Sequence, residues 1–305
     1  MAQLALVIVS WNVRELLRAC LQSLLDDLER SGIDADIWIV DNASADGTAD
    51  MVSTSYPSCH LIASPNNVGF AAGNNLAIRQ ILESSAPVPG FLWLLNPDTQ
   101  VKHGTARALL DALRAEPIAG IAGAKLLNSD GSLQQGGFHF PGLTQLAFEL
   151  FPLPARFFDT PLNGRYPRSL YDGVTPFFID HPLGASMVVR TAAAQEVGLM
   201  DEGYQMYCEE IDWCWRMRRA GWRAVCVPAA EVIHHGGQST SQVRIASFVS
   251  LWTSRARLYA TYHSRIVRTL ARAMVRMGMR RHMSGASPGM VAACEQVISV
   301  WRHTA

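Results

Sequence analysis

The first 95 residues alternate between apolar, β-branched runs and segments with helical spacing, and this alternation constrains the fold more than any other feature. The apolar runs predict buried strands at residues 4–11, 36–40, 60–63 and 91–95. The segments between them predict helices at residues 15–28, 46–52 and 69–82. Strands that alternate with helices pair in parallel, with helices on both faces of the sheet. We therefore predict an α/β fold, a three-layer α/β/α sandwich around a mostly parallel central sheet.

Polar residues follow each of these four predicted strands. The segments are Trp11-Asn12, Asp41-Asn42, Ser64-Pro65-Asn66 and Asn96-Pro97-Asp98. The carboxyl ends of parallel strands meet at one edge of a sheet, and open α/β sheets bind their ligands there. The sequence therefore predicts a ligand site built from four separate strand ends.

A glycine-rich turn opens the third predicted helix, where residues 67–75 read Asn-Val-Gly-Phe-Ala-Ala-Gly-Asn-Asn. Backbone N–H groups at such a helix start can hold a diphosphate. Asp98, after the fourth strand, can hold the divalent cation that a diphosphate needs. Together these features indicate a protein that handles a nucleotide-activated substrate.

Two further motifs lie outside this region. Residues 40–48 read Val-Asp-Asn-Ala-Ser-Ala-Asp-Gly-Thr, and residues 209–212 read Glu-Glu-Ile-Asp. With these motifs in order, the chain from about Leu4 to Thr240 resembles the family 2 glycosyltransferases. Within them it is most similar to the bacterial rhamnosyltransferase-like branch.

The resemblance implies a GT-A-type catalytic domain over residues 1–240. Its nucleotide-binding half would span about 1–127 and its acceptor-side half about 128–240, followed by a helical, basic appendage at 241–305. In the acceptor-side half we expect a hairpin at 128–137, an irregular insertion at 138–178 and a helix at 209–220. Short strands are expected at 187–189, 222–227 and 231–233, and a linker at 284–289.

The resemblance also implies an inverting transfer of a sugar from a nucleoside-diphosphate sugar, with dTDP-L-rhamnose as the first expectation and a UDP-hexose as the second. The acceptor would be a saccharide or a lipid-linked saccharide in cell-surface polysaccharide synthesis. The cofactor would be Mg²⁺ or Mn²⁺, because both prefer oxygen ligands and bridge phosphates.

Five residues are expected to contact the donor. By resemblance, Asp41 contacts the nucleobase or ribose, and Asn67 and Gly69 line the diphosphate pocket. Asn96 stands where the family usually has the first of two aspartates, so we expect it to contact ribose or a metal-bound water. Gly184 precedes a predicted strand that approaches the bound ligand closely.

Asp98 and His234 are the expected metal ligands. Asp98 matches the second aspartate of the family motif, and His234 ends a short predicted strand before two glycines. Alternation along that strand places His234 on the same side as Val232 and His235 on the other. We therefore favour His234 over its neighbour.

Glu210 is the expected general base, because sugar transfer to a hydroxyl needs a carboxylate to take the proton. The family commonly has Glu-Asp where this chain has Glu209-Glu210, and the longer side chain shifts the carboxylate by about one methylene. Glu209 and Asp212 also suit a helix start on electrostatic grounds alone. Glu209 therefore stays open as an alternative base.

Three other functions remain open at this stage. A Rossmann-type dehydrogenase is disfavoured because the first strand is followed by Ser10-Trp11-Asn12-Val13 and not by G-x-G-x-x-G. A nucleotidyltransferase would need a basic, glycine-rich loop at the same place. A catalytically inactive nucleotide-sugar-binding module would not need the acidic and histidine residues above.

The composition limits which binding partners and which cellular location we expect. Lys plus Arg and Asp plus Glu both number 26, so no overall charge attracts nucleic acid. The six cysteines lack a C-x-x-C pair, which suits reduced thiols in a cytoplasmic protein. No apolar run approaches the ~20 residues that span a bilayer. We expect a cytoplasmic protein, free or peripheral on the inner face of the cytoplasmic membrane.

Charge is nevertheless uneven, because no Asp or Glu occurs between Val232 and Cys294, whereas nine arginines do. Residues 265–277 predict a helix with Arg265, Arg268, Arg272 and Arg276 in one arc. Ile266, Val267, Leu270, Met274 and Met277 fall on the opposite side. Such a helix suits an anionic membrane surface. It equally suits packing on the catalytic domain or on a second copy of the chain.

Overall fold

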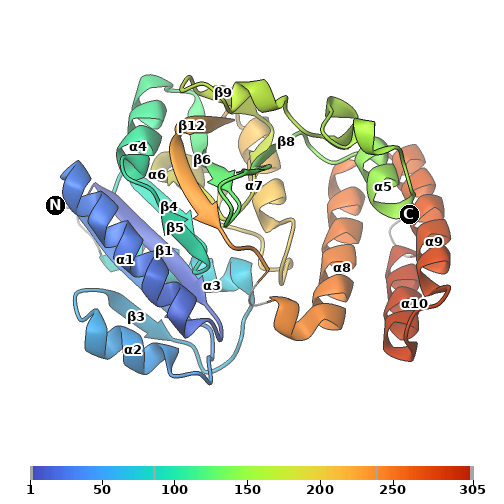
Figure 1. Ribbon diagram of the computed structural model, residues 1–305, viewed down its shortest axis with the longest axis horizontal. Coiled ribbons are helices and arrows are strands. Elements are labelled where there is room, and N and C mark those ends of the chain that lie inside the picture. Colours follow the sequence, from blue (N-terminus) through green and yellow to red (C-terminus); the bar gives the residue numbers. More distant parts are fainter. Residues whose placement is uncertain (1–2, 85–86, 238–239, 303–305) are drawn as a thin grey trace.

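The computed structural model describes residues 3–84, 87–237 and 240–302, which form an α/β body with a group of C-terminal helices beside it (Figure 1). The amino-terminal elements are β1 (Leu4–Ser10), α1 (Arg14–Ser31), β2 (Ala35–Asp41), α2 (Thr48–Ser55), β3 (His60–Ala63), α3 (Phe70–Ser84) and β4 (Phe91–Leu95). All seven were predicted, and β3 and β4 have the predicted bounds.

From residue 99 onward, strands and helices no longer alternate regularly. This part of the body contains β5 (Thr99–Val101), α4 (Thr105–Ala115), β6 (Ala119–Leu127), β7 (Leu133–Gln134), β8 (Gly137–Phe138), α5 (Leu143–Leu150), β9 (Phe177–Ile179), β10 (His181–Pro182), β11 (Ser186–Arg190), α6 (Thr191–Val197), α7 (Glu209–Arg219) and β12 (Arg223–His234). Short 3₁₀ turns lie at Ala155–Phe157, Pro161–Asn163, Arg168–Leu170 and Thr240–Val243. The C-terminal helices are α8 (Arg244–Tyr262), α9 (Arg265–Met283) and α10 (Pro288–Arg302).

The main sheet has the strand order β3-β2-β1-β4-β11-β6-β12-β5. The first four strands are parallel, as predicted, and β12 is parallel to β6. β11 lies antiparallel between β4 and β6, and this strand joins the two halves of the sheet. The parallel register sets Ser10 opposite Asp41, so the polar ends of β1 and β2 lie side by side.

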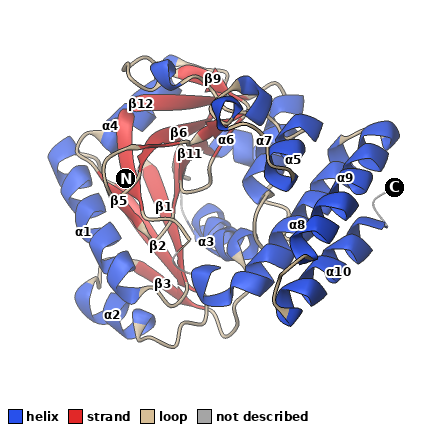
Figure 2. Ribbon diagram, turned by 45° about the vertical axis from the view of Figure 1, so that its right-hand side comes forward, coloured by secondary structure: helices blue, strands red, loops and turns tan. Residues whose placement is uncertain are grey.

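Helices lie on both faces of the sheet (Figure 2), and an apolar layer fills the space between the helices and each face. On one face, α1 and α4 pack Leu17, Leu21, Leu109 and Leu113 against strand residues such as Trp93. On the other, α3, α6 and α7 supply residues that include Ile78, Ala193, Trp213 and Met217. The predicted three-layer α/β/α sandwich is therefore confirmed.

Two predictions for the later part of the chain were wrong. The strands expected at 222–227 and 231–233 are one strand, β12, whose register with β6 shifts between Val227 and Glu231. The irregular region at 138–178 contains a helix, α5, that its sequence period did not reveal. Because α5 packs mainly against α9, its apolar residues are set by a partner far along the chain.

The C-terminal helices have an apolar core of their own. It joins Leu146 of α5 with residues of α8, α9 and α10, among them Trp252, Val275 and Trp301. The predicted linker at 284–289 is only a short turn between α9 and α10, two helices that pack on each other. All six cysteines are free thiols, and five of them are buried. Among the described residues, no helix is long and apolar enough to cross a membrane.

Asp27 connects two of the helices that cover the sheet. Its side chain is fully buried, and its carboxylate accepts hydrogen bonds from the backbone N–H groups of Gly104 (2.6 Å) and Ala106 (2.8 Å) at the start of α4. These donors have no partner within the helix. We expect Asp27→Ala to lower the free energy of unfolding in urea by about 1.5–3 kcal/mol. Asp34→Ala, at an exposed loop position, serves as the control, and an equal loss in both variants would contradict this role.

Candidate active site

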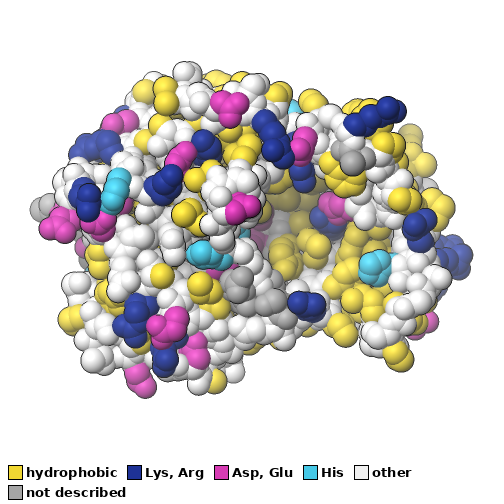
Figure 3. All heavy atoms as spheres, in the orientation of Figure 1, with side chains coloured by type: hydrophobic (Ala, Val, Ile, Leu, Met, Phe, Trp, Pro, Cys, Tyr) yellow, Lys and Arg dark blue, Asp and Glu magenta, His cyan; other side chains and the backbone are white. Residues whose placement is uncertain are grey.

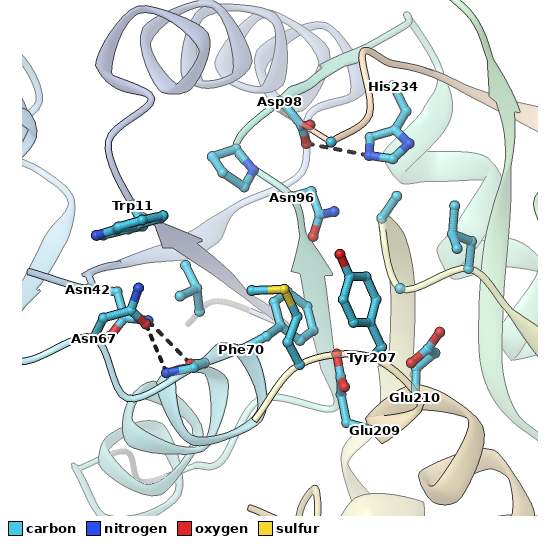
Figure 4. Close-up of a pocket in the computed structure, with 18 residues that line it drawn as sticks. Trp11, Asn42, Asn67, Phe70, Asn96, Asp98, Tyr207, Glu209, Glu210 and His234 are labelled. Carbon is cyan, nitrogen blue, oxygen red and sulfur yellow. Dashed lines mark hydrogen bonds and ion pairs between the residues drawn. The ribbon is translucent and has the colours of Figure 1, made fainter. Parts of the chain in front are cut away.

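A cavity of about 330 Å³ opens at the carboxyl ends of the parallel strands (Figure 4). Seven of the eight residues predicted for the site line it: Asn67, Gly69, Asn96, Asp98, Gly184, Glu210 and His234. Its size falls in the range of small-ligand pockets. Asp41 is not among the lining residues; it lies buried at the end of β2, beside the end of β1.

The loop between β3 and α3 is held by Asn42. The Asn42 side chain donates to Asn67 Oδ1 (2.9 Å) and accepts from the backbone N–H of Val68 (2.9 Å), and Asn67 Oδ1 also accepts from the N–H of Gly69. These contacts fix the turn that precedes α3. Asn42 was noted in the sequence only as the neighbour of Asp41, and its position at a strand end was the signal for this role.

Gly69 is required for a reason that the sequence did not reveal. Its φ of +87° lies in the left-handed region, and a Cβ at this position would collide with the backbone carbonyl of Gln205. The next residue, Phe70, donates its N–H to that same carbonyl (3.0 Å). The close approach in the structure is therefore to the segment that leads into α7, whereas the sequence suggested an approach to phosphate.

Several buried polar atoms at this edge of the sheet have no hydrogen-bond partner within the described parts of the chain. They are Ser10 Oγ, Asp41 Oδ1, Asn96 Oδ1 and Glu209 Oε2. Buried polar atoms in native proteins are nearly always paired, so a group of exceptions calls for an explanation. Burial also raises the pKa of Asp41. Asn96 and Glu209 line the cavity, so a polar ligand bound there would supply partners for these two residues.

Asp98 and His234 face each other across the upper part of the cavity (Figure 4). Asp98 Oδ1 lies 3.4 Å from Nε2 of His234, and both residues are more than nine-tenths buried. The other ring nitrogen, Nδ1, lies 2.8 Å from Oε1 of Gln134. His235 instead contacts Ser129 (2.8 Å).

This pair fits a divalent cation held jointly with a substrate. In the described part of the chain, no group of three or more His, Cys, Asp or Glu residues could hold a metal by itself. Mg²⁺ is typically bound by one or two carboxylates together with substrate phosphates. Asp98 and His234 offer a carboxylate oxygen and an imidazole nitrogen at one wall of the cavity, and both are donor types that bind divalent cations.

The start of α7 presents two buried carboxyl groups. The preceding residues Tyr207 (φ +71°) and Cys208 (φ +69°) are left-handed, an uncommon conformation for residues other than glycine. This turn brings Tyr207, Glu209 and Glu210 to the cavity wall. Asp212, one turn further, instead pairs with Arg216 (2.9 Å), as its helical spacing suggested.

Both carboxyl groups have raised pKa values. Burial raises the pKa of Glu210 to about 7. Burial and the charge of Glu210 together raise the pKa of Glu209 well above its usual range. Perturbed carboxyl groups of this kind are typical of functional sites.

A second cavity, of about 500 Å³, adjoins the first. The two share Leu183, Tyr207 and Glu210, so the Glu210 side chain lies on the wall between them. The second cavity is enclosed by residues of α5, α7 and α8 and by the segment between α5 and β10. Trp11 also lines the first cavity, as expected of the strand end after β1. Phe70 and Met206 line it as well, and the sequence motifs gave neither of them a role in the site.

Residues 5–181 match the family model described as glycosyl transferase family 2. The chain is 32% identical over 214 residues to the N-acetylglucosaminyl-diphospho-decaprenol L-rhamnosyltransferase of Mycobacterium tuberculosis, covering 68% of each protein. It is 28% identical to rhamnosyltransferase WbbL of Escherichia coli K12, covering 55% of this chain and 61% of that protein.

Solved structures with low sequence identity share the fold. GalNAc-T7 with UDP, GalNAc and Mn²⁺ gives a TM-score of 0.60 at 14% identity, covering 97% of this chain and 54% of that one. The mannosyltransferase PcManGT of Pyrobaculum calidifontis, in complex with GDP-Man and Mn²⁺, gives 0.53 at 12% identity, covering 99% and 73%.

The parallel sheet with its strand-end cavity is that of the GT-A class of glycosyltransferases. This chain belongs to glycosyl transferase family 2. Both statements confirm what the sequence motifs predicted.

The Asp98–His234 pair leads to a test of metal-dependent donor binding. A ligand at a hundred times its dissociation constant stabilises the folded state by ~2.7 kcal/mol. We expect dTDP-L-rhamnose or a UDP-hexose with Mn²⁺ to raise the melting temperature of the wild type. Asp98→Asn should remain folded and lose this metal-dependent rise, because the amide carries no charge. Asp130→Asn, in an exposed turn, is the control, and an undiminished rise in Asp98→Asn would argue against the pair.

Proposed function

We propose that this protein is an inverting, metal-dependent glycosyltransferase that transfers a sugar from a nucleoside-diphosphate sugar to a saccharide or lipid-linked saccharide acceptor. The observation that carries the proposal is that Glu210 and the Asp98–His234 pair line one cavity at the carboxyl ends of the strands. The names of two relatives, an L-rhamnosyltransferase and a rhamnosyltransferase, support L-rhamnose as the transferred sugar. We propose dTDP-L-rhamnose as the donor, with a UDP-hexose as the second candidate.

The roles follow from chemistry and placement. Glu210 takes the proton of the acceptor hydroxyl as its oxygen forms a bond to the anomeric carbon. The bond from that carbon to the diphosphate breaks, and the nucleoside diphosphate leaves from the opposite face, which inverts the configuration. A divalent cation bound at Asp98 and His234 would neutralise the charge that develops on the diphosphate. Asp41, Asn67, Gly69, Asn96 and Gly184 position the donor.

The choice of Glu210 over Glu209 rests on two observations. Glu210 lies on the wall between the two cavities, where a donor and an acceptor would meet, whereas Glu209 lines only the first. The pKa of Glu210 is raised to about 7 by burial, so part of the protein holds it as a carboxylate at neutral pH. A base has to be deprotonated to act.

Glu210→Gln should lower turnover by ~10²–10⁴-fold with little change in donor affinity, because only the proton acceptor is lost. In the wild type, turnover should rise with pH and level off above about 7, as the raised pKa of Glu210 requires. Glu209→Gln is the matched control. A larger loss of turnover in Glu209→Gln would move the base by one residue. Full turnover in both variants would show that neither carboxyl group is the base, whereas donor binding without turnover in the wild type would leave a nucleotide-sugar-binding module.

We also propose that α9 docks on an anionic membrane surface, where a lipid-linked acceptor would be found. The sequence had placed five apolar residues on one face of this helix, but the structure divides them. Val267 and Met274 pack into the C-terminal core, whereas Ile266, Leu270 and Met277 are exposed, to 74%, 49% and 58%. At 100° per residue these three fall within one narrow arc.

The arginines of α9 also differ from the predicted single arc. Arg268 and Arg272 are half-buried and reach the backbone carbonyls of Ala260 and Arg302. Arg265, Arg276, Arg280 and Arg281 are exposed, on both sides of the apolar arc. In Figure 3, hydrophobic and basic side chains gather at the right-hand edge, over the C-terminal helices. An apolar stripe between cations suits an anionic lipid interface, with ~1 kcal/mol per arginine.

Co-sedimentation with vesicles tests this docking. We expect the protein to sediment with vesicles that contain phosphatidylglycerol and not with phosphatidylcholine alone, and to be released at high salt. The double variant Ile266→Ser and Leu270→Ser should lose most of this binding. Val174→Ser removes an equally exposed valine from the catalytic body and should bind as the wild type does. Equal sedimentation of all three proteins would assign the stripe to packing against another chain.

A further inference from the structure

The proposed reaction needs two binding sites, one for the donor and one for the acceptor, and the first cavity accounts only for the donor. The second cavity meets the first only at Leu183, Tyr207 and Glu210. Because Glu210 lies on the wall between them, a group held in the second cavity can present a hydroxyl to this carboxylate. Figure 3 shows the hollow between the α/β body and the C-terminal helices, with hydrophobic side chains on its walls.

The walls of this cavity are largely apolar and aromatic. Two helices and the loop between α5 and β9 supply Leu146, Phe148, Phe158, Leu251 and Leu258. Phe148 and Phe158 pack edge to face, with ring centroids 5.5 Å apart. A saccharide alone would leave most of this surface without an apolar partner, and such surface binds apolar groups favourably.

Polar and charged side chains lie on the same walls, among them His139, Asn163 and His181. Arg255 of α8 forms an ion pair with Glu149 of α5, with Nη2 2.7 Å from Oε1. Gln145 and Arg165 also line the cavity. Pockets that combine an apolar wall with a few fixed polar groups orient amphiphilic ligands. The chemistry therefore matches a molecule with a polar sugar at the Glu210 end and an apolar body.

We infer that this second cavity is the acceptor site, and that it selects a saccharide whose reducing end carries an apolar group. One wall of the site comes from α8, so the C-terminal helices form part of the substrate-binding machinery and are not an inert appendage. The inference rests on the proposed function. It goes further by naming the place, the walls and the amphiphilic character of the acceptor.

Photo-crosslinking locates this ligand without requiring turnover. The probe is an octyl β-glycoside of N-acetylglucosamine with a diazirine in its alkyl chain, used on the full chain with octyl N-acetylglucosaminide as competitor. We expect labelled peptides from residues 143–150 and 244–262, and loss of label with the competitor. Label that is spread over the surface, or that resists competition, would overturn the inference.

Two variants connect the label to the apolar walls. Phe148→Ser and Leu251→Ser change half-buried residues, so both should fold. Each should reduce labelling about tenfold or more, the loss expected from removing an apolar side chain from a binding surface. Ile118→Ser, an exposed position outside this cavity, is the control and should label as the wild type does. Unchanged labelling in both cavity variants would refute the assignment.

Donor binding is measured on the same proteins by the rise in melting temperature with nucleotide sugar and Mn²⁺. We expect this rise to be equal in the wild type, Phe148→Ser and Leu251→Ser. If the donor binds and the cavity is not labelled, the acceptor inference fails and the proposed function stands. If the cavity is labelled and no nucleotide sugar binds, the proposed function fails instead.

Discussion

The parallel hydrogen bonding of β1 with β2 and β4 is the interaction on which the site depends. It sets Ser10 opposite Asp41 and brings the ends of the strands to one edge, so residues from separate strands and loops meet there. The apolar residues of both faces keep these strands buried and therefore rigid. A site at this edge is held by backbone geometry, and loop residues such as Asn42 adjust only its details.

A second constraint joins the two halves of the catalytic body. β11 pairs antiparallel with β4 and β6, and the N–H of Asn96 donates to the carbonyl of Ala185 beside the cavity. On the other side, Gly69 and Phe70 close against Gln205, just before the turn into α7. The donor loop and the carboxyl groups of α7 are thus fixed relative to each other, which suits a reaction between two bound substrates.

The C-terminal helices have one face toward the α/β body and another that is exposed. Toward the body, Tyr204, Cys208 and Leu258 form a small apolar cluster that ties α8 to the start of α7. Away from it, α9 exposes Ile266, Leu270 and Met277 among arginines. A single group of helices therefore contacts both the segment that carries Glu210 and the surrounding medium.

The sequence by itself determined the elements whose patterns are local. Apolar runs identified β1 to β4, the helices between them followed from spacing, and the polar residues after each strand marked the site edge. Motif resemblance added Asp98, Glu210 and His234, which the structure brings to one cavity. Only the tertiary structure decided the rest. The helix α5, the continuity of β12, the Gln134 contact to His234 and the second cavity depend on partners distant in the chain. These features arise from packing between segments that are distant in the chain, and no local period or propensity encodes such packing.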